Sequence, residues 1–488
     1  MRGFVETTIE VDAETAERPS ALQIDDRDEP FRILILGNFS GRKNHRGELR
    51  QANRPMLVDP DTLDDVIAGV TPSVHVPLGG SEQATLPIEF HSLEDFHPDS
   101  LYRRLPLFQA LQSAKERLAG ARWRPSAEPP AAPPVAPASI EGSLLDAILS
   151  QQSPAPAPAV ENGSSHTKNL SDREWNLLID RIVSPHVSPV QDPRQLQAVK
   201  KVDEEIAGRM RAILHDPGFQ KVEAAWRAVD FLLRRIETGT QLSLHVLDFS
   251  YEDYLLDAAP SGELESSHLY KLLVPEAGAL GSRRWSLIVG LYQVSPHAGE
   301  LQALTRIAAL ARQAGAPFLA GAAPQFVEAP DFDTHSDPHD WKEKMEDVAA
   351  GLWRDLRHNP ESQWIGLALP RFLLRLPYGK DTSSVDEFEF EEMPGLPSHG
   401  DYLWGNPSVA CACALVTGSL ELKGMPVHTY KQDGEAEMKP CAEMWFTDRA
   451  VDRFLKAGLM GIASIKNSDS IRVLRLQSIN ADSPKLSA

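Results

Sequence analysis

The stretch FRILILG, at residues 31–37, constrains the fold more strongly than any other part of the chain. It contains an unbroken run of large apolar residues from Ile33 to Leu36. A strand with one face in water alternates apolar and polar side chains, whereas a strand covered on both faces reads as a continuous apolar run. The run therefore predicts an inner strand of a sheet, buried on both faces.

The residues after this strand, GNFSGRKNHRG, raise the question of a phosphate-binding loop. Such a loop needs closely spaced glycines, then a lysine and a hydroxyl at the start of a helix. Gly37 and Gly41 are present, but no Gly-Lys-Ser or Gly-Lys-Thr follows, and the glycine spacing of a dinucleotide-binding turn is absent too. Residues 42–46 have the polar composition of a loop. The sequence argues against nucleotide binding, and we expect no cofactor.

Length and charge set the broad class of the protein. The chain has 488 residues and a formal net charge of −20. Single domains seldom exceed about 250 to 300 residues, so this length predicts about two to four domains. A strongly acidic chain is repelled by nucleic acid and by anionic membrane surfaces. We therefore expect no nucleic-acid partner.

Cysteine usage and the N-terminal residues indicate the compartment. Cys411, Cys413 and Cys441 cannot all pair and form no CxxC motif, which fits a reducing cytosol. Residues 1–20 are acidic and lack the apolar segment of a signal peptide. No apolar run reaches the roughly 18 residues that a membrane-spanning helix needs. These features predict a cytoplasmic protein without membrane insertion.

Two stretches rich in proline and alanine, residues 124–139 and 153–165, divide the chain. This composition buries little surface and favours extended backbone. We therefore interpret residues 125–168 as a linker between a first domain at 1–124 and a second domain at 169–488.

Between the two stretches, residues 141–151 predict a short helix. Its apolar side is formed by Leu144, Leu145, Ile148 and Leu149. A helix of about three turns is not stable alone in water. It needs a partner, which is either another protein or the rest of this chain.

Hydrophobic periodicity predicts an α/β fold with mixed sheets and flanking helices. In the first domain we expect a strand at 33–36, a helix at 60–70, strands near 73–79 and 84–92, and a helix from about Ser100. The second domain opens with two helical stripes separated at Pro217, followed by a strand in 242–250.

The later part of the second domain carries the clearest α/β signals. Strand 286–292, helix 299–316 and strand 317–323 have the lengths of a parallel βαβ unit. The last expected elements are strands at 441–446, 460–468 and 470–479 and a helix at 447–458, with Thr447 as N-cap and Gly458 as C-terminal stop.

Several blocks of the sequence, in one order, resemble two subunits of a known assembly. The blocks FRILILGNFSGR and LPIEFHSLEDFHPDSLYRRLPLFQAL resemble the small subunit of the type VI secretion contractile sheath, called TssB or VipA. Later blocks resemble the large subunit, called TssC or VipB; they are AILHDPGFQKVEAAWRAVDFLLRRIETG, LPRFLLRLPYG, YLWGNPSVA and MPVHTYKQDGEAEMKPCAEMWFTDRAVDRFLKAGLMGIASIKNSDS. The chain resembles a fusion of both subunits.

The resemblance implies a structural, non-enzymatic role. In this family, small and large subunits interlock into a protomer, and protomers stack into a helical tube that contracts around an inner tube of Hcp-like protein. Implied partners are other sheath subunits, the inner tube and the baseplate. A ClpV-like AAA+ ATPase grasps a short helix near the start of the large subunit, which makes Leu144, Leu145, Ile148 and Leu149 candidate contacts.

The resemblance also assigns the first apolar run to a core strand and turn where small and large subunits meet. On this interpretation, Gly37 and Gly41 serve backbone geometry and close packing rather than ligand capture. The second domain would then cover the strand.

Two departures from the family pattern leave a second function open. The segment between ACACALVTGSLELKG and MPVHTY is shorter, and the family's large subunit continues beyond the point that corresponds to Ala488. We expect assembly through strand augmentation, in which chains share backbone hydrogen bonds at sheet edges. The alternative is a cap, adaptor or regulatory module that binds a sheath built by other subunits.

One segment, DFDTHSDPHD, raises the question of a metal site. His335 and His339 lie four apart, a spacing that binds metal on a helix. Pro338 breaks such a helix, so we expect a loop in which Asp337 or Asp340 caps the helix that follows. No metal ligand is expected.

The remaining reactive side chains have structural interpretations. We interpret Cys411 and Cys413 as small core residues. His428 lacks a nucleophile in a recognisable context and is expected to pack or to hydrogen-bond. The cations of GRKNHRGELRQANR, residues 41–54, fit either a solvated loop or a contact between protomers. We predict no catalytic residue.

Overall fold

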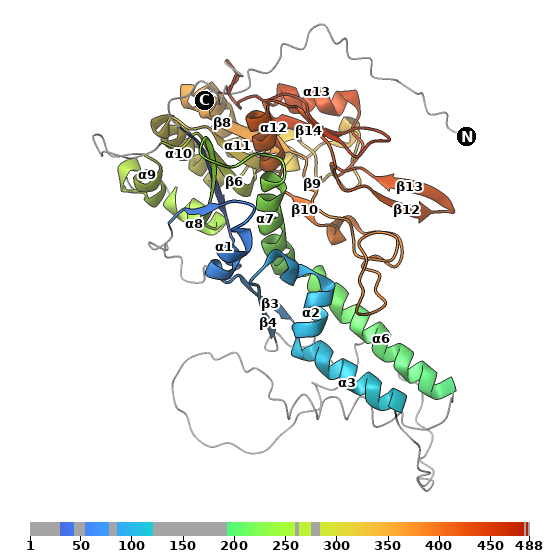
Figure 1. Cartoon of the computed structure of the whole chain (residues 1–488). Helices are drawn as coiled ribbons and strands as arrows, with labels where there is room; N and C mark the ends of the chain where they lie inside the picture. Colours follow the sequence, from blue (N-terminus) through green and yellow to red (C-terminus); the bar gives the residue numbers. More distant parts are fainter. Residues whose placement is uncertain are drawn as a thin grey trace, which may run out of the picture.

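The computed structural model describes residues 30–42, 54–77, 85–120, 193–258, 263–274, 284–482 and 485–486. The predicted linker at 125–168 and its helix at 141–151 lie outside these residues. The described part is an α/β fold with mixed sheets and flanking helices, as predicted (Figure 1).

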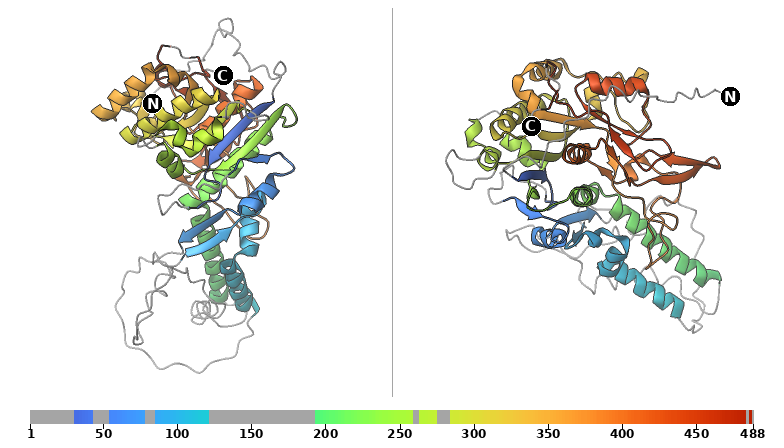
Figure 2. Two further views of the ribbon diagram at one scale, coloured as in Figure 1. Left: turned by 90° about the vertical axis from the view of Figure 1, so that its left-hand side faces the viewer. Right: turned by 45° about the horizontal axis from the view of Figure 1, so that its top comes forward.

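One large mixed sheet runs through the described part of the chain (Figure 2). Its nine strands lie in the order β11 (Glu421–Leu422), β15 (Ile471–Val473), β14 (Met460–Ser464), β8 (Ile365–Leu369), β7 (Phe318–Ala322), β6 (Leu287–Val294), β1 (Phe31–Gly37), β5 (Leu242–Asp248) and β2 (Met56–Val58). The strands from β14 to β5 are parallel, whereas β15 and β2 run antiparallel to their neighbours. Strand β1 thus lies between two strands that come much later in the sequence.

Strand β1 is buried on both faces. It pairs with β5 along its whole length and with β6 along its inner part. Side chains alternate between the faces of a sheet. Ile33 and Ile35 therefore enter the core on one face, whereas Leu34 and Leu36 enter the core on the other. All four are fully buried, so the prediction of an inner strand is confirmed.

Helices cover both faces of the sheet. On the face of Leu34 and Leu36 these are α8 (Tyr251–Asp257), α9 (His268–Leu273), α10 (Ala298–Ala314), α11 (Asp347–His358) and α13 (Asp448–Lys456). On the opposite face they are α7 (Pro217–Leu233) and α12 (Pro407–Thr417). Strand β6, helix α10 and strand β7 form the predicted parallel βαβ unit. Within the described ranges, no helix is long and apolar enough to cross a membrane.

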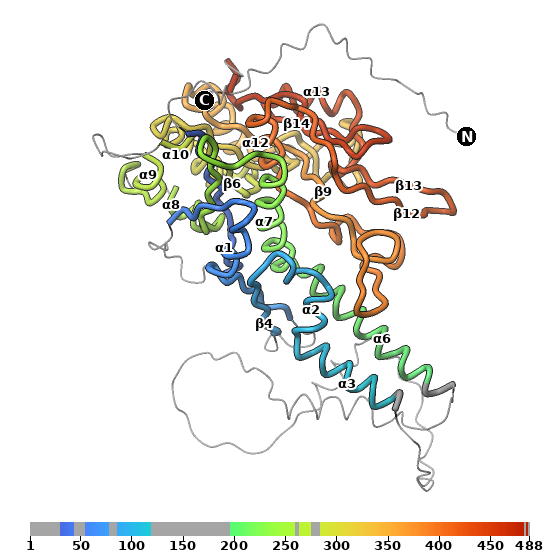
Figure 3. Tube along the Cα trace, viewed as in Figure 1, coloured from blue at the N-terminus to red at the C-terminus, as the bar shows by residue number. Residues whose placement is uncertain are grey.

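The rest of the N-terminal region continues the core beside α7. It contains α1 (Leu63–Val70), the paired strands β3 (Ser73–Pro77) and β4 (Thr85–Glu89), α2 (Pro98–Arg104) and α3 (Pro106–Gly120). The helix predicted from Ser100 is two helices, because Leu105 adopts an extended backbone before Pro106. Helix α3 lies along α6 (Pro193–Leu214), and the pair extends away from the sheet (Figure 3).

In the C-terminal part, some predicted elements form and others do not. Thr447 caps α13 by accepting from Ala450 N–H, and Gly458 ends the helix with a φ of +79°, as predicted. The predicted strand at 441–446 is wrong, since residues 441–444 form bends and residues 445 and 446 are irregular. The carboxylate of Glu443 accepts hydrogen bonds from the backbone and the guanidinium of Arg371, which turns the chain inward. Of the predicted strand at 470–479, only β15 forms.

Two small ribbons complete the described strands. Strand β9 (Phe372–Leu373) pairs with β10 (Trp404–Gly405), and β12 (His428–Gln432) pairs with β13 (Glu435–Lys439). The β12–β13 hairpin extends beyond the body of the molecule (Figure 1).

Replacing a core residue of β1 tests its central position. Ile35→Ala should lower the free energy of unfolding by about 2–5 kcal/mol, because it leaves a cavity at a fully buried site. The matched control is Leu57→Ala on edge strand β2, where the side chain is 56% exposed and the expected loss is within about 0.5 kcal/mol. Urea unfolding followed by tryptophan fluorescence measures both. Equal losses would contradict the central position of β1.

Candidate functional site

The residues that join the N-terminal and C-terminal regions form the candidate site, which we call the joint. It consists of β1 with its following turn, helix α2, and a loop at residues 374–393 that we call the strap. Strand β1 pairs with β5 from Phe31, which lies opposite Leu242, to Gly37, which lies opposite Asp248. Burying each large aliphatic side chain contributes about 1.5–3 kcal/mol before entropic costs. The strand alone is therefore a strong attachment.

The turn after β1 is held by side chains of the C-terminal region. The carboxylate of Asp248 accepts the backbone N–H groups of Phe39 and Ser40 at 2.8 and 3.0 Å. Trp226 Nε1 donates to the carbonyl of Phe39 at 3.0 Å, and the two rings lie 4.9 Å apart. The backbone amides that a phosphate loop would offer to a ligand already donate to a carboxylate. This turn is a structural contact.

Both predicted glycines lie in tightly packed positions of the joint. Gly41 has a φ of +70°, and a Cβ there would lie 2.4 Å from the carbonyl oxygen of Ser73 and 2.9 Å from Cγ2 of Val222. A Cβ on Gly37, the last residue of β1, would lie 3.1 Å from Cδ1 of Leu291. Gly41 is fixed by both its backbone conformation and its neighbours.

Helix α2 carries the second contact between the regions. The buried carboxylate of Asp99 accepts the backbone N–H groups of Asp386 and Glu387 at 3.1 and 2.9 Å. Three residues further along α2, the ring of Tyr102 stacks on the ring of Phe388 with centroids 4.4 Å apart. The strap is thus attached to the N-terminal region by backbone hydrogen bonds and by an aromatic contact.

A buried charge network attaches the other side of the strap to α7. Arg375 Nε donates to Glu223 at 2.8 Å, and Arg375 Nη1 donates to Glu392 at 2.8 Å. Arg227 Nε also donates to Glu223, at 2.7 Å, and its Nη2 donates to the hydroxyl of Tyr378 at 3.0 Å. Two guanidinium groups and two carboxylates balance, as buried charges require.

The network makes the joint sensitive to acid. Burial is the largest single influence and raises the pKa of Glu392, but the Arg375 guanidinium, the nearby His215 and the Tyr378 N–H together outweigh it and lower that pKa to about 2. Because the folded pKa lies below the usual value of 4.5, this carboxylate stabilises the fold at higher pH. The contribution is lost as the pH falls from about 4.5 towards 2.

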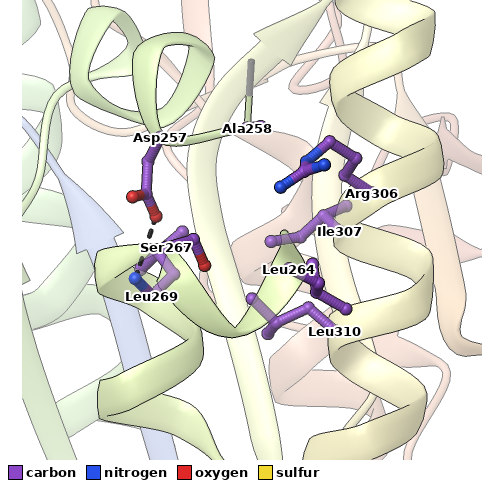
Figure 4. Close-up of a pocket in the computed structure, with 8 residues that line it drawn as sticks. All are labelled: Asp257, Ala258, Leu264, Ser267, Leu269, Arg306, Ile307 and Leu310. Carbon is purple, nitrogen blue, oxygen red and sulfur yellow. Dashed lines mark hydrogen bonds between the residues drawn. The ribbon is translucent and has the colours of Figure 1, made fainter. Parts of the chain in front are cut away.

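Outside the joint, a small hollow lies between α8, α9 and α10 (Figure 4). Its volume is about 10 Å³, which is close to the room that one water molecule needs. The carboxylate of Asp257 on its wall accepts the N–H groups of His268 and Leu269 at 2.7 and 2.9 Å, so it caps α9. The hollow is too small for an organic substrate.

The two histidines of the predicted loop contact different residues. His335 Nδ1 lies 3.1 Å from a carboxylate oxygen of Asp331, whereas His339 Nε2 lies 2.9 Å from Nη1 of Arg449. In the part of the chain that the structure describes, no group of three or more histidine, cysteine, aspartate or glutamate side chains could hold a metal ion.

The predicted cap in this loop is wrong. Asp337 accepts the N–H of His339 and caps only a short 3₁₀ turn, Pro338–Asp340. Helix α11 begins later, at Asp347, without a side-chain cap. The residues between are extended and irregular, with Trp341 buried in the core.

The cysteines and His428 have the structural roles that we predicted. Cys411 and Cys413 lie on α12 and are fully buried. Burial raises the pKa of the Cys413 thiol to about 11, which makes it a poor nucleophile. His428 Nδ1 lies 2.6 Å from the hydroxyl of Tyr402 in a buried hydrogen bond, and burial lowers the pKa of His428.

Sequence patterns did not identify the charged residues of the joint. An arginine inside the apolar run LLRLP, at Arg375, was the available signal of a buried ion pair, because an isolated buried charge is very costly. The candidate ATPase contacts Leu144, Leu145, Ile148 and Leu149 lie outside the described residues.

Cutting the chain between the two regions tests the joint. We would introduce a specific protease site into residues 124–139. After cleavage the two fragments should co-elute in size-exclusion chromatography, because β1 stays paired on both sides. Ile35→Asp places a charge in the core and should release the fragments or prevent folding. Fragments of the parent protein that separate, each soluble and compact, would contradict the joint.

Removing one carboxylate tests the charge network. Glu392→Gln leaves Arg375 undercompensated and should cost about 3–5 kcal/mol at pH 7. The acid-dependent loss of stability between about pH 4.5 and 2 should also become smaller. The control is Glu361→Gln, which breaks a surface pair with Arg312 and should cost less than about 1 kcal/mol. Urea unfolding at several pH values gives both quantities; similar losses in both variants would refute the network.

Comparison with known proteins agrees with this arrangement. Residues 196–480 match the family VipB (EvpB), tail sheath N-terminal domain, and residues 9–123 match VipA of the type VI secretion system. A curated relative, type VI secretion system sheath protein TssC1 of Pseudomonas aeruginosa, is 29% identical over an alignment of 300 residues that covers 58% of this chain and 60% of the relative. The match to VipB covers more than half of the sequence, so the chain belongs to the VipB tail sheath family and carries a VipA-family region ahead of it.

Proposed function

We propose that the chain is a structural component of a type VI secretion-like contractile sheath, in which the VipA-like and VipB-like regions form one building unit. One observation carries the proposal: β1, from the VipA-matched region, is hydrogen-bonded on both sides to strands of the VipB-matched region. A strand held in this way cannot leave without opening the central sheet. The two regions therefore move as one body, as the wall of a force-transmitting tube requires.

Assembly of such units would use the ends of the large sheet. Among the described residues, neither β2 nor β11 has a strand on its outer side. An end strand offers unpaired backbone N–H and C=O groups to another chain. We infer that neighbouring sheath subunits, whether copies of this chain or separate ones, add to these edges.

A sheath component is expected to have further partners. A sheath encloses an inner tube, so an Hcp-like protein and a baseplate are the expected contacts at the lumen and at one end. A ClpV-like ATPase would act on the segment around residues 141–151, through Leu144, Leu145, Ile148 and Leu149. We infer that the protein acts in the bacterial cytoplasm, where these proposed partners would meet it.

The proposal assigns no enzymatic activity to the chain. Two findings support this. The amides of the turn after β1 donate to Asp248, and the guanidinium of Arg375 is saturated by Glu223 and Glu392. Groups that are fully engaged with one another are not available to bind and transform a substrate.

Negative-stain electron microscopy of the purified protein, alone and with an Hcp-like inner-tube protein, tests the proposal. We expect long striated tubes, because rigid units with open sheet edges grow by addition. Discrete particles that bind to sheaths made from other subunits would instead support a cap, adaptor or regulator. ATP turnover, or metal retained after extensive dialysis, would contradict a purely structural role.

A further inference from the structure

The β12–β13 hairpin is held at its base by side chains of the segment that leads into β10. His428 and Lys439 lie opposite each other and form the pair of the hairpin that is farthest from its turn. The hydroxyl of Tyr402 lies 2.6 Å from Nδ1 of His428, and Nζ of Lys439 lies 3.1 Å from Nδ1 of His399. Beyond this base, residues 431–437 are all exposed (Figure 1). The contacts at the base therefore fix how the hairpin projects into solvent.

The ring of His399 has different surroundings at its two nitrogens. Nε2 lies 3.0 Å from a carboxylate oxygen of Glu443, which also accepts from the guanidinium of Arg371. An ionised carboxylate can only accept, so Nε2 carries the proton and donates to it. Nδ1 is then the unprotonated nitrogen, and its lone pair accepts from the ammonium of Lys439. Both contacts together are possible only for a neutral imidazole.

A second group faces Nδ1 of His399. A carboxylate oxygen of Asp333 lies 3.5 Å from this nitrogen. The side chain of His399 is 9% exposed and that of Asp333 is 53% exposed, so solvent reaches the ring from the side of the carboxylate. A protonated ring has N–H groups at both nitrogens and cannot accept from an ammonium. It can donate to Asp333 instead.

The charges around His399 balance while the ring is neutral. The charged groups that face the ring among the described residues are Arg371 and Glu443 beside Nε2, and Lys439 and Asp333 beside Nδ1. The ring itself stacks on Trp404, with centroids 4.8 Å apart. Burial lowers the pKa of the Lys439 ammonium, although nearby carboxylates oppose the shift. A second positive charge on the ring would add repulsion at a site that already disfavours this ammonium.

The other contact at the base responds less to a fall in pH. The hydroxyl of Tyr402 donates to Nδ1 of His428. Burial lowers the pKa of His428, although the carboxylate of Glu392 acts in the opposite direction. This ring therefore stays neutral when the pH falls through about 6.5, where an imidazole in water takes up a proton. Strand β12 keeps its attachment to Tyr402.

We propose that His399 is a proton-controlled latch for the β12–β13 hairpin. The neutral ring accepts from Lys439 and holds β13 at its base. The protonated ring donates to Asp333, Lys439 is released, and the hairpin pivots on β12. Because only the neutral ring accepts from Lys439, the held position is favoured at higher pH and is lost as the pH falls.

The latch acts in a different range of pH from the charge network of the joint. Imidazoles change charge between about pH 8 and 5, whereas the contribution of Glu392 is lost only below about pH 4.5. The hairpin can therefore be released while the joint is intact. This inference concerns a single chain and does not depend on the proposed sheath role, so its test stands whether or not the protein forms tubes.

A spin label near the turn of the hairpin tests the latch. Gln432→Cys offers an exposed thiol for a nitroxide, whereas the native cysteines are buried and stay unlabelled. Electron paramagnetic resonance of the full chain should show a slow component at about pH 8 and a growing mobile component towards about pH 5. If one proton drives release, the ratio of mobile to slow label rises by up to about tenfold for each unit by which the pH falls.

Three variants in the labelled protein assign the transition to this cluster. His399→Asn places a carbonyl oxygen near the position of Nδ1 and takes up no proton, so the label should stay slow across the range. Asp333→Asn removes the carboxylate that favours the protonated ring and should move the transition to lower pH. Lys439→Met should give a mobile label at every pH. The matched control Lys431→Met, at an exposed position of the same hairpin, should behave like the parent.

Several outcomes would overturn the latch. One is a label whose mobility stays constant between about pH 8 and 5. Others are a transition that persists in His399→Asn, because the proton then binds elsewhere, and a Lys439→Met label as slow as that of the parent. If His399→Asn is mobile at every pH, Asp333→Asn decides: a transition at lower pH supports the latch, and an unchanged one overturns it. Thermal unfolding verifies that each variant folds.

Discussion

The backbone ladder on both sides of β1 is the interaction on which the rest of the structure depends. Without β1, β5 and β6 would be separated by the width of a strand, and the apolar cores on both faces would open. Because β1 belongs to the VipA-matched region and its neighbours belong to the VipB-matched region, neither region has a complete sheet without the other. Covalent fusion makes this obligatory contact intramolecular, which raises the effective concentration of each region for the other.

The polar contacts around β1 fix one arrangement of the two regions. Asp248 and Trp226 hold the turn, Asp99 holds the strap, and Arg375 lies between two carboxylates. A buried ion network adds little net stability compared with apolar packing of the same volume, yet losing one partner is expensive. Apolar burial therefore holds the regions together, whereas the buried charges exclude shifted arrangements. The polar contacts of the joint do not involve the end strands β2 and β11 or the β12–β13 hairpin, which face outward.

Local patterns predicted the elements that local interactions determine. The continuous apolar run predicted β1. The succession of a strand, a helix and a strand predicted β6, α10 and β7, and Thr447 and Gly458 predicted the two ends of α13. Sequence reasoning failed where a distant side chain decides the local path. The segment at 441–446 reads as a strand, but the carboxylate of Glu443 turns inward to Arg371, which is far away in the sequence. Asp337 reads as a helix cap, but the helix starts only after an irregular stretch that buries Trp341.

The sequence by itself determined the α/β class, the need to bury Ile33 to Leu36 on both faces, and the resemblance to both sheath subunits. Those properties are encoded in residue type and spacing along a single segment. Only the tertiary structure decided that β5 and β6 flank β1, and that Glu223, Arg375 and Glu392 meet in one buried network. The physical reason is that a local pattern specifies how much a residue must be buried or neutralised. Which other residue buries or neutralises that residue depends on the path of the whole chain.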